Sequence, residues 1–152
     1  MAERGVPFTQ VFLRGWDHHG SLPKQIPQLC KAMDQPSAAL IKDLKQRGML
    51  DDTLVVFATE FGRTPRLNKF QGRDHWAFGY SHAFAGAGVP GGQVVGRTDR
   101  EGGYVIERPY LPDDVAATIY EKFGIDRSQP VYTPAKRPVF LAHHGQRIEE
   151  LF

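Results

Sequence analysis

A chain of 152 residues, 41% of them hydrophobic and 24% charged, is long enough to bury a core and has the composition of a globular protein. The net charge is +2 and the basic residues are scattered, which argues against a nucleic-acid or anionic membrane surface. Cys30 is the single cysteine, so an intramolecular disulfide and a thiolate metal cluster are excluded. We expect no membrane span, because no apolar run reaches about 18 residues, and no signal peptide, which leaves the localisation open.

The first half of the chain predicts a strand, a loop and a long helix. Val6–Leu13 mixes β-branched and aromatic residues, which favours a strand, and Gly15–Gly20 is its outgoing loop. Apolar residues at helical spacing predict a helix over Pro27–Arg47, with a kink or a break at Pro36 and a stop at Gly48. The apolar stripe comprises Leu29, Met33, Leu40, Ile41 and Leu44.

A nearly continuous apolar run over Thr53–Thr59 predicts a second strand that is buried on both faces. Strand, helix and strand form a β-α-β unit, whose two strands should be parallel with a right-handed crossover. Asp17 and Glu60 follow the carboxyl ends of these strands, so we expect both carboxylates at one edge of the sheet. Two like charges brought together there need a cation or a proton.

The second half of the chain is richer in loops. Gly62–Tyr80 indicates a long functional loop, Ser81–Gly86 a strand of small residues, and Gly88–Tyr104 a hairpin or an irregular excursion. Pro112–Phe123 predicts a second helix, whose buried stripe is expected to comprise Val115, Ile119, Tyr120 and Phe123, with Gly124 as the stop. Pro138–Leu141 is expected to form a last short strand.

Three segments carry the chemistry that these elements would bring together. Gly15–Gly20 reads Gly-Trp-Asp-His-His-Gly, and Thr59–Pro65 and Gly72–Trp76 contain further carboxylates, arginines and a histidine. Carboxylate and imidazole are the usual ligands of Zn²⁺ and similar divalent ions. The sequence therefore predicts a metal site at the sheet edge. The alternative is that Asp17 caps a turn and the imidazoles are solvated.

These segments, in this order and spacing, resemble the bacterial DUF1501 family of the alkaline phosphatase and sulfatase superfamily of metallohydrolases. The resemblance implies an α/β fold, a partial alkaline-phosphatase-like sandwich with a mostly parallel central sheet and flanking helices. It further implies that residues 1–152 form a single domain, the C-terminal part of a longer one whose earlier part carries the nucleophile. The other matching stretches are Asp43–Gly48, Thr53–Ala58 and Ile148–Phe152.

The resemblance assigns metal ligands by position. Asp17, His19 and His75 match the ligands of one ion, and Glu60 stands where a ligand of a second ion is expected. Phe61 replaces the histidine that follows in sulfatases, so the second site would be weaker or built differently. For Glu60, an ion pair with a neighbouring arginine is an equal alternative, the candidates being Arg63 and Arg73.

Three further side chains receive roles by the same argument. Arg63 and Arg73 could bind phosphate or sulfate oxygens through their guanidinium forks, although structural roles are commoner for arginine. Asp74 could be a ligand, and we prefer the interpretation that it orients a ligating imidazole. His18 ranks below His19 as a ligand, because the family commonly carries another residue there.

The leading hypothesis is a metallohydrolase domain that acts on a phosphate or sulfate ester. Its cofactors would be divalent ions, Zn²⁺ or Mn²⁺/Ca²⁺, and its partner a small-molecule ester, with an upstream domain half or an oligomer partner completing the site. The rival is a non-catalytic metal-binding or interaction domain that retains the fold without the nucleophile. The resemblance does not decide whether the chain is itself an enzyme, because resemblance of fold alone does not establish function.

Overall fold

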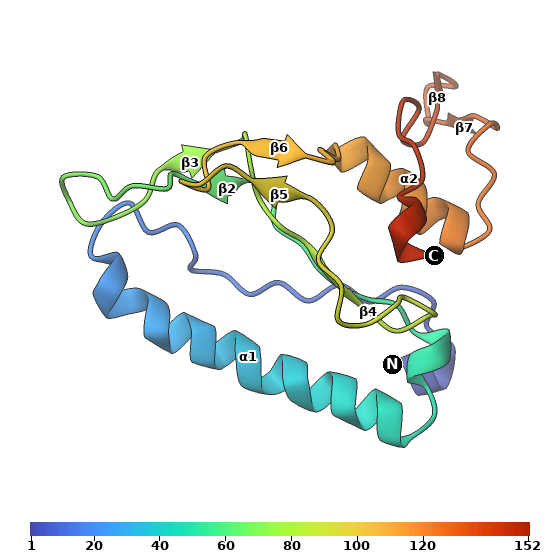
Figure 1. Ribbon diagram of the computed structural model, residues 1–152. Helices are drawn as coiled ribbons and strands as arrows, with labels where there is room; N and C mark the ends of the chain where they lie inside the picture. Colours follow the sequence, from blue (N-terminus) through green and yellow to red (C-terminus); the bar gives the residue numbers. More distant parts are fainter. The chain divides into compact units, whose positions relative to one another are not determined.

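The computed structural model describes residues 1–152 and divides into two compact units. Unit 1 comprises residues 1–91 and 98–105, and unit 2 comprises residues 92–97 and 106–152. The helices are α1 (Leu22–Gln46) and α2 (Pro112–Lys122), with 3₁₀ turns at Ala2–Arg4, Leu50–Asp52 and Glu149–Leu151 (Figure 1). The strands are β1 (Val55–Phe57), β2 (Gly62–Arg63), β3 (His75–Trp76), β4 (Ala83–Ala85), β5 (Arg97–Thr98), β6 (Val105–Glu107), β7 (Val131–Tyr132) and β8 (Pro138–Val139). The expectation of a single domain stays a prediction.

The strands form four separate two-stranded sheets, so the predicted sandwich with a mostly parallel central sheet is wrong. β1 pairs with β4 in antiparallel register, Val55 opposite Ala85 and Phe57 opposite Ala83. β2 pairs with β3 and β7 with β8, both also antiparallel. The parallel crossover rule applies only when both strands of a β-α-β unit join one sheet. Here only the segment after α1 does so.

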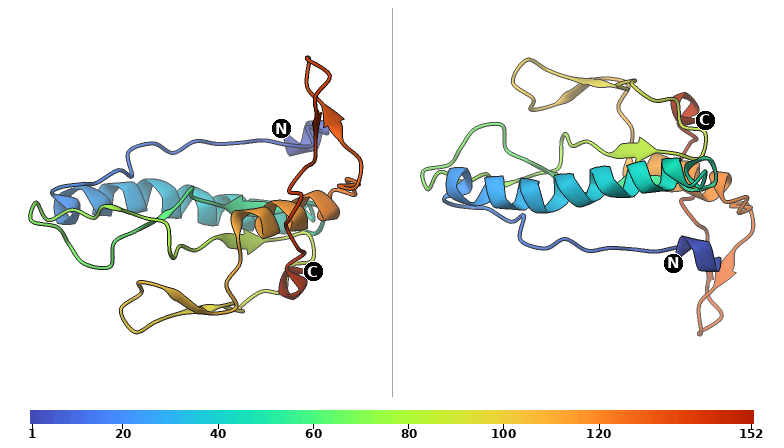
Figure 2. Two further views of the ribbon diagram at one scale, coloured as in Figure 1. Left: turned by 90° about the horizontal axis from the view of Figure 1, so that it is seen from above. Right: turned by 90° about the horizontal axis from the view of Figure 1, so that it is seen from below.

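The predicted first strand, Val6–Leu13, is not a strand in the structure. It runs as an extended trace along α1 (Figure 1 and Figure 2), and its backbone has no partner over residues 7–15. Phe8 is 67% exposed and Val11 86% exposed. The β-branched and aromatic composition that predicted a strand is therefore present without the neighbouring strand that would pair with it.

Helix α1 is one continuous element of 25 residues, although Pro27 and Pro36 lie inside it (Figure 1). The predicted helix is confirmed, and it begins earlier than expected, at Leu22. Pro36 does not divide it into two helices. Its end is the predicted one, because Gly48 adopts a left-handed φ of 66° there. No helix of the chain has the length and apolar character that a membrane crossing requires.

Helix α2 and the C-terminal segment form the core of unit 2. Ala117 is fully buried, and Ile148 and Leu151 are at most 7% exposed. The hydroxyl of Thr118 donates to the carbonyl of Asp114 at 2.7 Å and accepts the backbone N–H of Ile148 at 2.9 Å. The helix is confirmed, but its expected stripe is not the most buried face, since Phe123 is 50% exposed.

Candidate metal centre

The candidate site in unit 1 is built by two backbone segments that run side by side. Gly20 and Gln71 form an isolated antiparallel bridge. The N–H of Leu22 donates to the carbonyl of Gln71 at 2.9 Å, and the N–H of Arg73 donates to the carbonyl of His18 at 2.9 Å. Gly72 makes this approach possible, because a Cβ there would lie 2.0 Å from the carbonyl carbon of His19. The β2–β3 hairpin extends the second segment and places Arg63 opposite His75. The convergence thus arises from local pairing rather than from a parallel sheet edge.

Three side chains expected to ligate one ion meet at this point. The Asp17 Oδ1 atom lies 2.9 Å from Nε2 of His75 and 3.0 Å from Nε2 of His19, and the two Nε2 atoms are 3.2 Å apart. All three side chains are about half exposed to solvent, at 63%, 47% and 51% for Asp17, His19 and His75. The expected proximity of Asp17 and His75 is therefore present, at an open surface position.

The spacing of these three atoms fits a single divalent ion. Ligands that bind Zn²⁺ tetrahedrally at about 2.0–2.1 Å lie about 3.3 Å from one another. The observed separations of 2.9, 3.0 and 3.2 Å form a nearly equilateral triangle of that size. Two imidazole nitrogens and one carboxylate oxygen suit Zn²⁺ better than Ca²⁺, which takes oxygen ligands.

Asp74 determines which nitrogen of His19 faces the triangle. Its Oδ1 atom lies 2.7 Å from Nδ1 of His19. Because a carboxylate only accepts hydrogen bonds, Nδ1 of His19 carries the proton, and Nε2 of the neutral ring is left with its lone pair. This hydrogen bond, and then one from Asn68, lowers the pKa of Asp74. Asp74 therefore lies where an orienting residue would, beside the imidazole rather than among the three convergent atoms.

The lone pair on His19 leaves too few protons for the contacts in the triangle. Nε2 of His75 can donate one hydrogen to either Asp17 or His19, and no other proton lies on the three atoms. The hydrogen bond from His75, followed by that from Arg63, lowers the pKa of Asp17 to about 2. Asp17 is thus a carboxylate at neutral pH. A cation or an added proton would relieve the short contact for which these three atoms have no proton.

Arg63, Arg73 and Glu60 occupy different places around this cluster. The Nη2 atom of Arg63 lies 2.7 Å from Oδ1 of Asp17. Nη1 of Arg73 instead donates to the carbonyl of Thr64 at 3.0 Å, a contact within the β2–β3 hairpin. Glu60 forms no ion pair with either arginine and lies outside the group of three convergent ligand atoms. His18 is 6% exposed, and its Nδ1 has no hydrogen-bond partner.

A cavity of about 350 Å³ opens beside Asp17 and His75. Its walls combine apolar side chains with two arginines and the carboxylate of Glu60, whereas Arg73 is not part of them. One of the two arginines is Arg14, which was not among the residues predicted from the sequence, and its guanidinium adds a positive charge to the wall. The lining residues are Leu13, Arg14, Gly15, Trp16, Asp17, Glu60, Phe61, Arg63 and His75.

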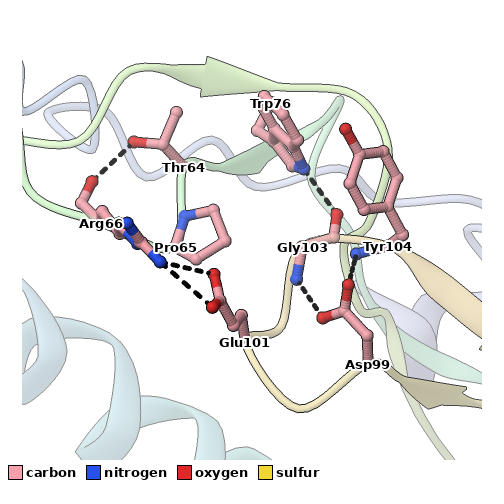
Figure 3. A pocket seen from close by; sticks show the side chains of 8 residues that line it. All are labelled: Thr64, Pro65, Arg66, Trp76, Asp99, Glu101, Gly103 and Tyr104. Carbon is pink, nitrogen blue, oxygen red and sulfur yellow. Dashed lines mark hydrogen bonds and ion pairs between the residues drawn. The ribbon is translucent and has the colours of Figure 1, made fainter.

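A second cavity of unit 1, about 250 Å³, adjoins Trp76, the strand neighbour of His75 (Figure 3). The indole of Trp76 donates to the carbonyl of Gly103 at 2.6 Å, and Arg66 pairs with both oxygens of Glu101 at 3.0 and 3.1 Å. Asp99 accepts the backbone N–H groups of Gly103 and Tyr104. These polar groups are satisfied by one another, which indicates a structural contact between the hairpin and residues 98–105.

Asn68 also contacts the candidate site, and the sequence did not point to it. It lies in the loop between β2 and β3, and its side chain contacts both Asp74 and the backbone of His19. The signals in the sequence were general ones, an asparagine followed closely by a glycine in a loop. They predict a turn, and they do not predict what the amide contacts.

An open cluster of one carboxylate and two imidazoles, beside a cavity with two arginines, is the arrangement of a candidate three-ligand metal centre. The family model described as "Protein of unknown function (DUF1501)" matches residues 1–152. The chain therefore belongs to the DUF1501 family. Neither the curated proteins nor the solved structures contain a significant match to it.

Proposed function

We propose that the Asp17–His19–His75 cluster binds one divalent ion, Zn²⁺ foremost, as part of a metallohydrolase-type site for phosphate or sulfate esters. The observation that carries the proposal is the triangle of ligand atoms 2.9 to 3.2 Å apart, with the carboxylate of Asp74 2.7 Å from Nδ1 of His19. The resemblance to the alkaline phosphatase and sulfatase superfamily supports the same interpretation.

The cavity beside the triangle supports an anionic ligand. Arg14 and Arg63 bring two cations to its wall, and guanidinium groups bind phosphate and sulfate oxygens. Leu13, Trp16 and Phe61 provide apolar surface for the rest of the ester. A bound divalent ion would supply Lewis-acid polarisation of the ester oxygen. On this proposal Arg63 orients Asp17, to which it is paired at 2.7 Å, as well as the ligand.

Metal titration tests the proposal directly. We expect calorimetry to show uptake of one Zn²⁺ per chain, with much weaker binding of Ca²⁺ because nitrogen ligands do not suit it. His75→Ala should weaken Zn²⁺ binding, since one imidazole ligand is lost, whereas His144→Ala in unit 2 should not. Absence of Zn²⁺ and Mn²⁺ uptake, or equal uptake by the His75 variant, would show that the assignment is wrong.

A non-catalytic metal-binding role is the second candidate, and one observation favours it. None of the residues that line the cavity beside Asp17 and His75 carries a hydroxyl or a thiol that could attack an ester. We therefore expect no measurable turnover of an aryl phosphate or aryl sulfate by this chain with Zn²⁺ or Mn²⁺ added, unless a partner supplies the nucleophile. Metal-dependent turnover that Asp17→Asn abolishes would favour the complete hydrolase instead.

A further inference from the structure

Asn68, the only asparagine of the chain, uses every hydrogen-bonding position of its side chain. Its Nδ2 donates to the carbonyl of His19 at 3.0 Å and to Oδ1 of Asp74 at 3.1 Å. Its Oδ1 accepts the backbone N–H groups of Phe70 at 2.9 Å and Gly72 at 3.0 Å. The amide therefore has two separate halves, an acceptor half that shapes the loop and a donor half that reaches the candidate metal centre.

The donor half of Asn68 contacts the two groups that determine how His19 is presented. One amide nitrogen binds the backbone of His19 and also the carboxylate oxygen that binds its ring. Asp74 Oδ1 is thereby shared between Nδ1 of His19 at 2.7 Å and Nδ2 of Asn68 at 3.1 Å. Fixing this oxygen fixes the ring, because an imidazole follows the acceptor of its Nδ1–H.

We propose that Asn68 is a positioning residue that holds Asp74 so that His19 keeps Nε2 directed at Asp17 and His75. The effect of Asn68 on metal binding rests on the proposed function. The geometric claim about His19 can be tested without metal. The alternative is a purely structural role, in which Asn68 only shapes the loop through its hydrogen bonds with Phe70 and Gly72, as asparagine commonly does in turns.

Asn68→Asp separates the two roles, because it keeps the acceptor oxygen and removes the donor. The loop contacts to Phe70 and Gly72 can persist, while the new carboxylate repels Asp74. Gln71→Glu is the matched control. It adds the same charge to the same loop, and the side chain of Gln71 forms no hydrogen bond. If the added negative charge acted only by attracting the cation, both variants would bind Zn²⁺ more tightly than the wild type. Weaker Zn²⁺ binding by Asn68→Asp alone would therefore not be an effect of charge.

The experiment has a metal-bound and a metal-free measurement. With metal, we expect Asn68→Asp to weaken Zn²⁺ binding by roughly 10–100-fold, the usual cost of losing an outer partner of a ligating histidine, and to alter the visible spectrum of bound Co²⁺. Without metal, long-range ¹H–¹⁵N spectra should show the Nδ1–H tautomer of His19 in the wild type and in Gln71→Glu. In Asn68→Asp the two tautomers should be mixed.

The outcomes distinguish the two claims. If Asn68→Asp matches Gln71→Glu in tautomer and, where metal binds, in affinity and Co²⁺ spectrum, Asn68 only shapes the loop and the inference is wrong. If the wild type takes up no metal, the proposed function fails, and the tautomer of His19 still decides the role of Asn68. Circular dichroism of both variants verifies that the fold is retained.

Discussion

The two units of the chain each gather ionisable side chains, but they balance them differently. In unit 2, Glu150 accepts the hydroxyl of Tyr110 at 2.7 Å and the guanidinium of Arg108 at 2.8 Å, so each acceptor atom faces a donor. In unit 1, Arg63 donates to Oδ1 of Asp17 at 2.7 Å, but that oxygen and the Nε2 atoms of His19 and His75 lie 2.9–3.2 Å from one another with a single proton, on His75, among them. Every short contact of the first arrangement has its donor, whereas the second has fewer protons than short contacts.

The pKa shifts follow the same contrast. The hydroxyl of Tyr110, followed by other hydrogen-bonding and charged neighbours, lowers the pKa of Glu150, while burial and then Glu150 raise the pKa of Tyr110. Donor and acceptor thus each stabilise the form that suits the pair. The pKa of Asp17 is lowered first by the hydrogen bond from His75, whose Nε2 proton a metal ion would displace, and then by the hydrogen bond from Arg63. We therefore expect substitutions in the Glu150 cluster of unit 2 to change mainly the stability of the fold. Substitutions in the Asp17 cluster of unit 1 should change mainly the binding of metal.

Replacing one carboxylate in each unit should give the largest contrast. Asp17→Asn removes a charged metal ligand, so we expect Zn²⁺ binding to fall by more than the roughly 10–100-fold that loss of an outer partner costs. Glu150→Gln should leave Zn²⁺ affinity unchanged and lower the melting temperature. Calorimetric titration and thermal unfolding of both variants test this. Equal loss of Zn²⁺ binding in both variants would contradict the contrast between the units.

Zinc itself should stabilise the two units unequally. At a free concentration about 100 times the Kd, a ligand specific to the native state adds about 2.7 kcal/mol, which corresponds to roughly 5–10 °C in a chain of this size. Hydrogen exchange should slow in residues 18–22 and 70–75, whose backbones pair beside the cluster, and remain unchanged in α2. Excess EDTA is the control, since it should reverse the protection. Uniform protection of α2 would argue for nonspecific binding.

How far the sequence predicted these features depended on the range of the interactions. Helices α1 and α2 and the stop at Gly48 were predicted correctly, because periodicity and a left-handed glycine are local signals. The partner of a strand is not local. Val6–Leu13 has the composition of a strand without forming one, and the strand predicted at Thr53–Thr59 appears as β1 with an antiparallel partner.

The candidate site shows the same limit in its details. Asp17, His19 and His75 were grouped correctly in space, although the predicted reason, a parallel sheet edge, is wrong. The actual cause is backbone pairing across Gly72, which sequence patterns do not reveal. Asn68 was missed because the hydrogen bond that ties it to the backbone of His19 spans 49 residues, and its contact with Asp74 depends on the shape of the loop. The metal-binding roles themselves stay predictions.

The acid limb of the stability profile should depend on Asp17. Its pKa lies near 2 in the folded chain and at 3.8 when unperturbed, so the folded state favours the carboxylate. A lowered pKa contributes stability that is complete above about pH 4 and is lost as the pH falls toward about 2. Urea unfolding of metal-free wild type and Asp17→Asn should show a difference that shrinks over this range. A difference that grows on acidification would contradict the sign.

The smallest effect should be an alkaline one in unit 2, where Tyr110 is the responsible group. Burial, and then the hydrogen bond to Glu150, raise the pKa of Tyr110 above its usual 10.0, so the folded state favours the neutral phenol. A raised pKa gives stability that is complete below about pH 10 and declines as the pH rises through the folded value. Tyr110→Phe removes this titration together with one hydrogen bond, so it should lower the melting temperature by no more than about 3 °C near neutral pH. The gap to wild type should then narrow above about pH 10, while Zn²⁺ affinity stays unchanged. Loss of Zn²⁺ binding in this variant would show that the two clusters are coupled, and it would contradict the contrast between a cluster with a donor for each contact and one with fewer protons than contacts.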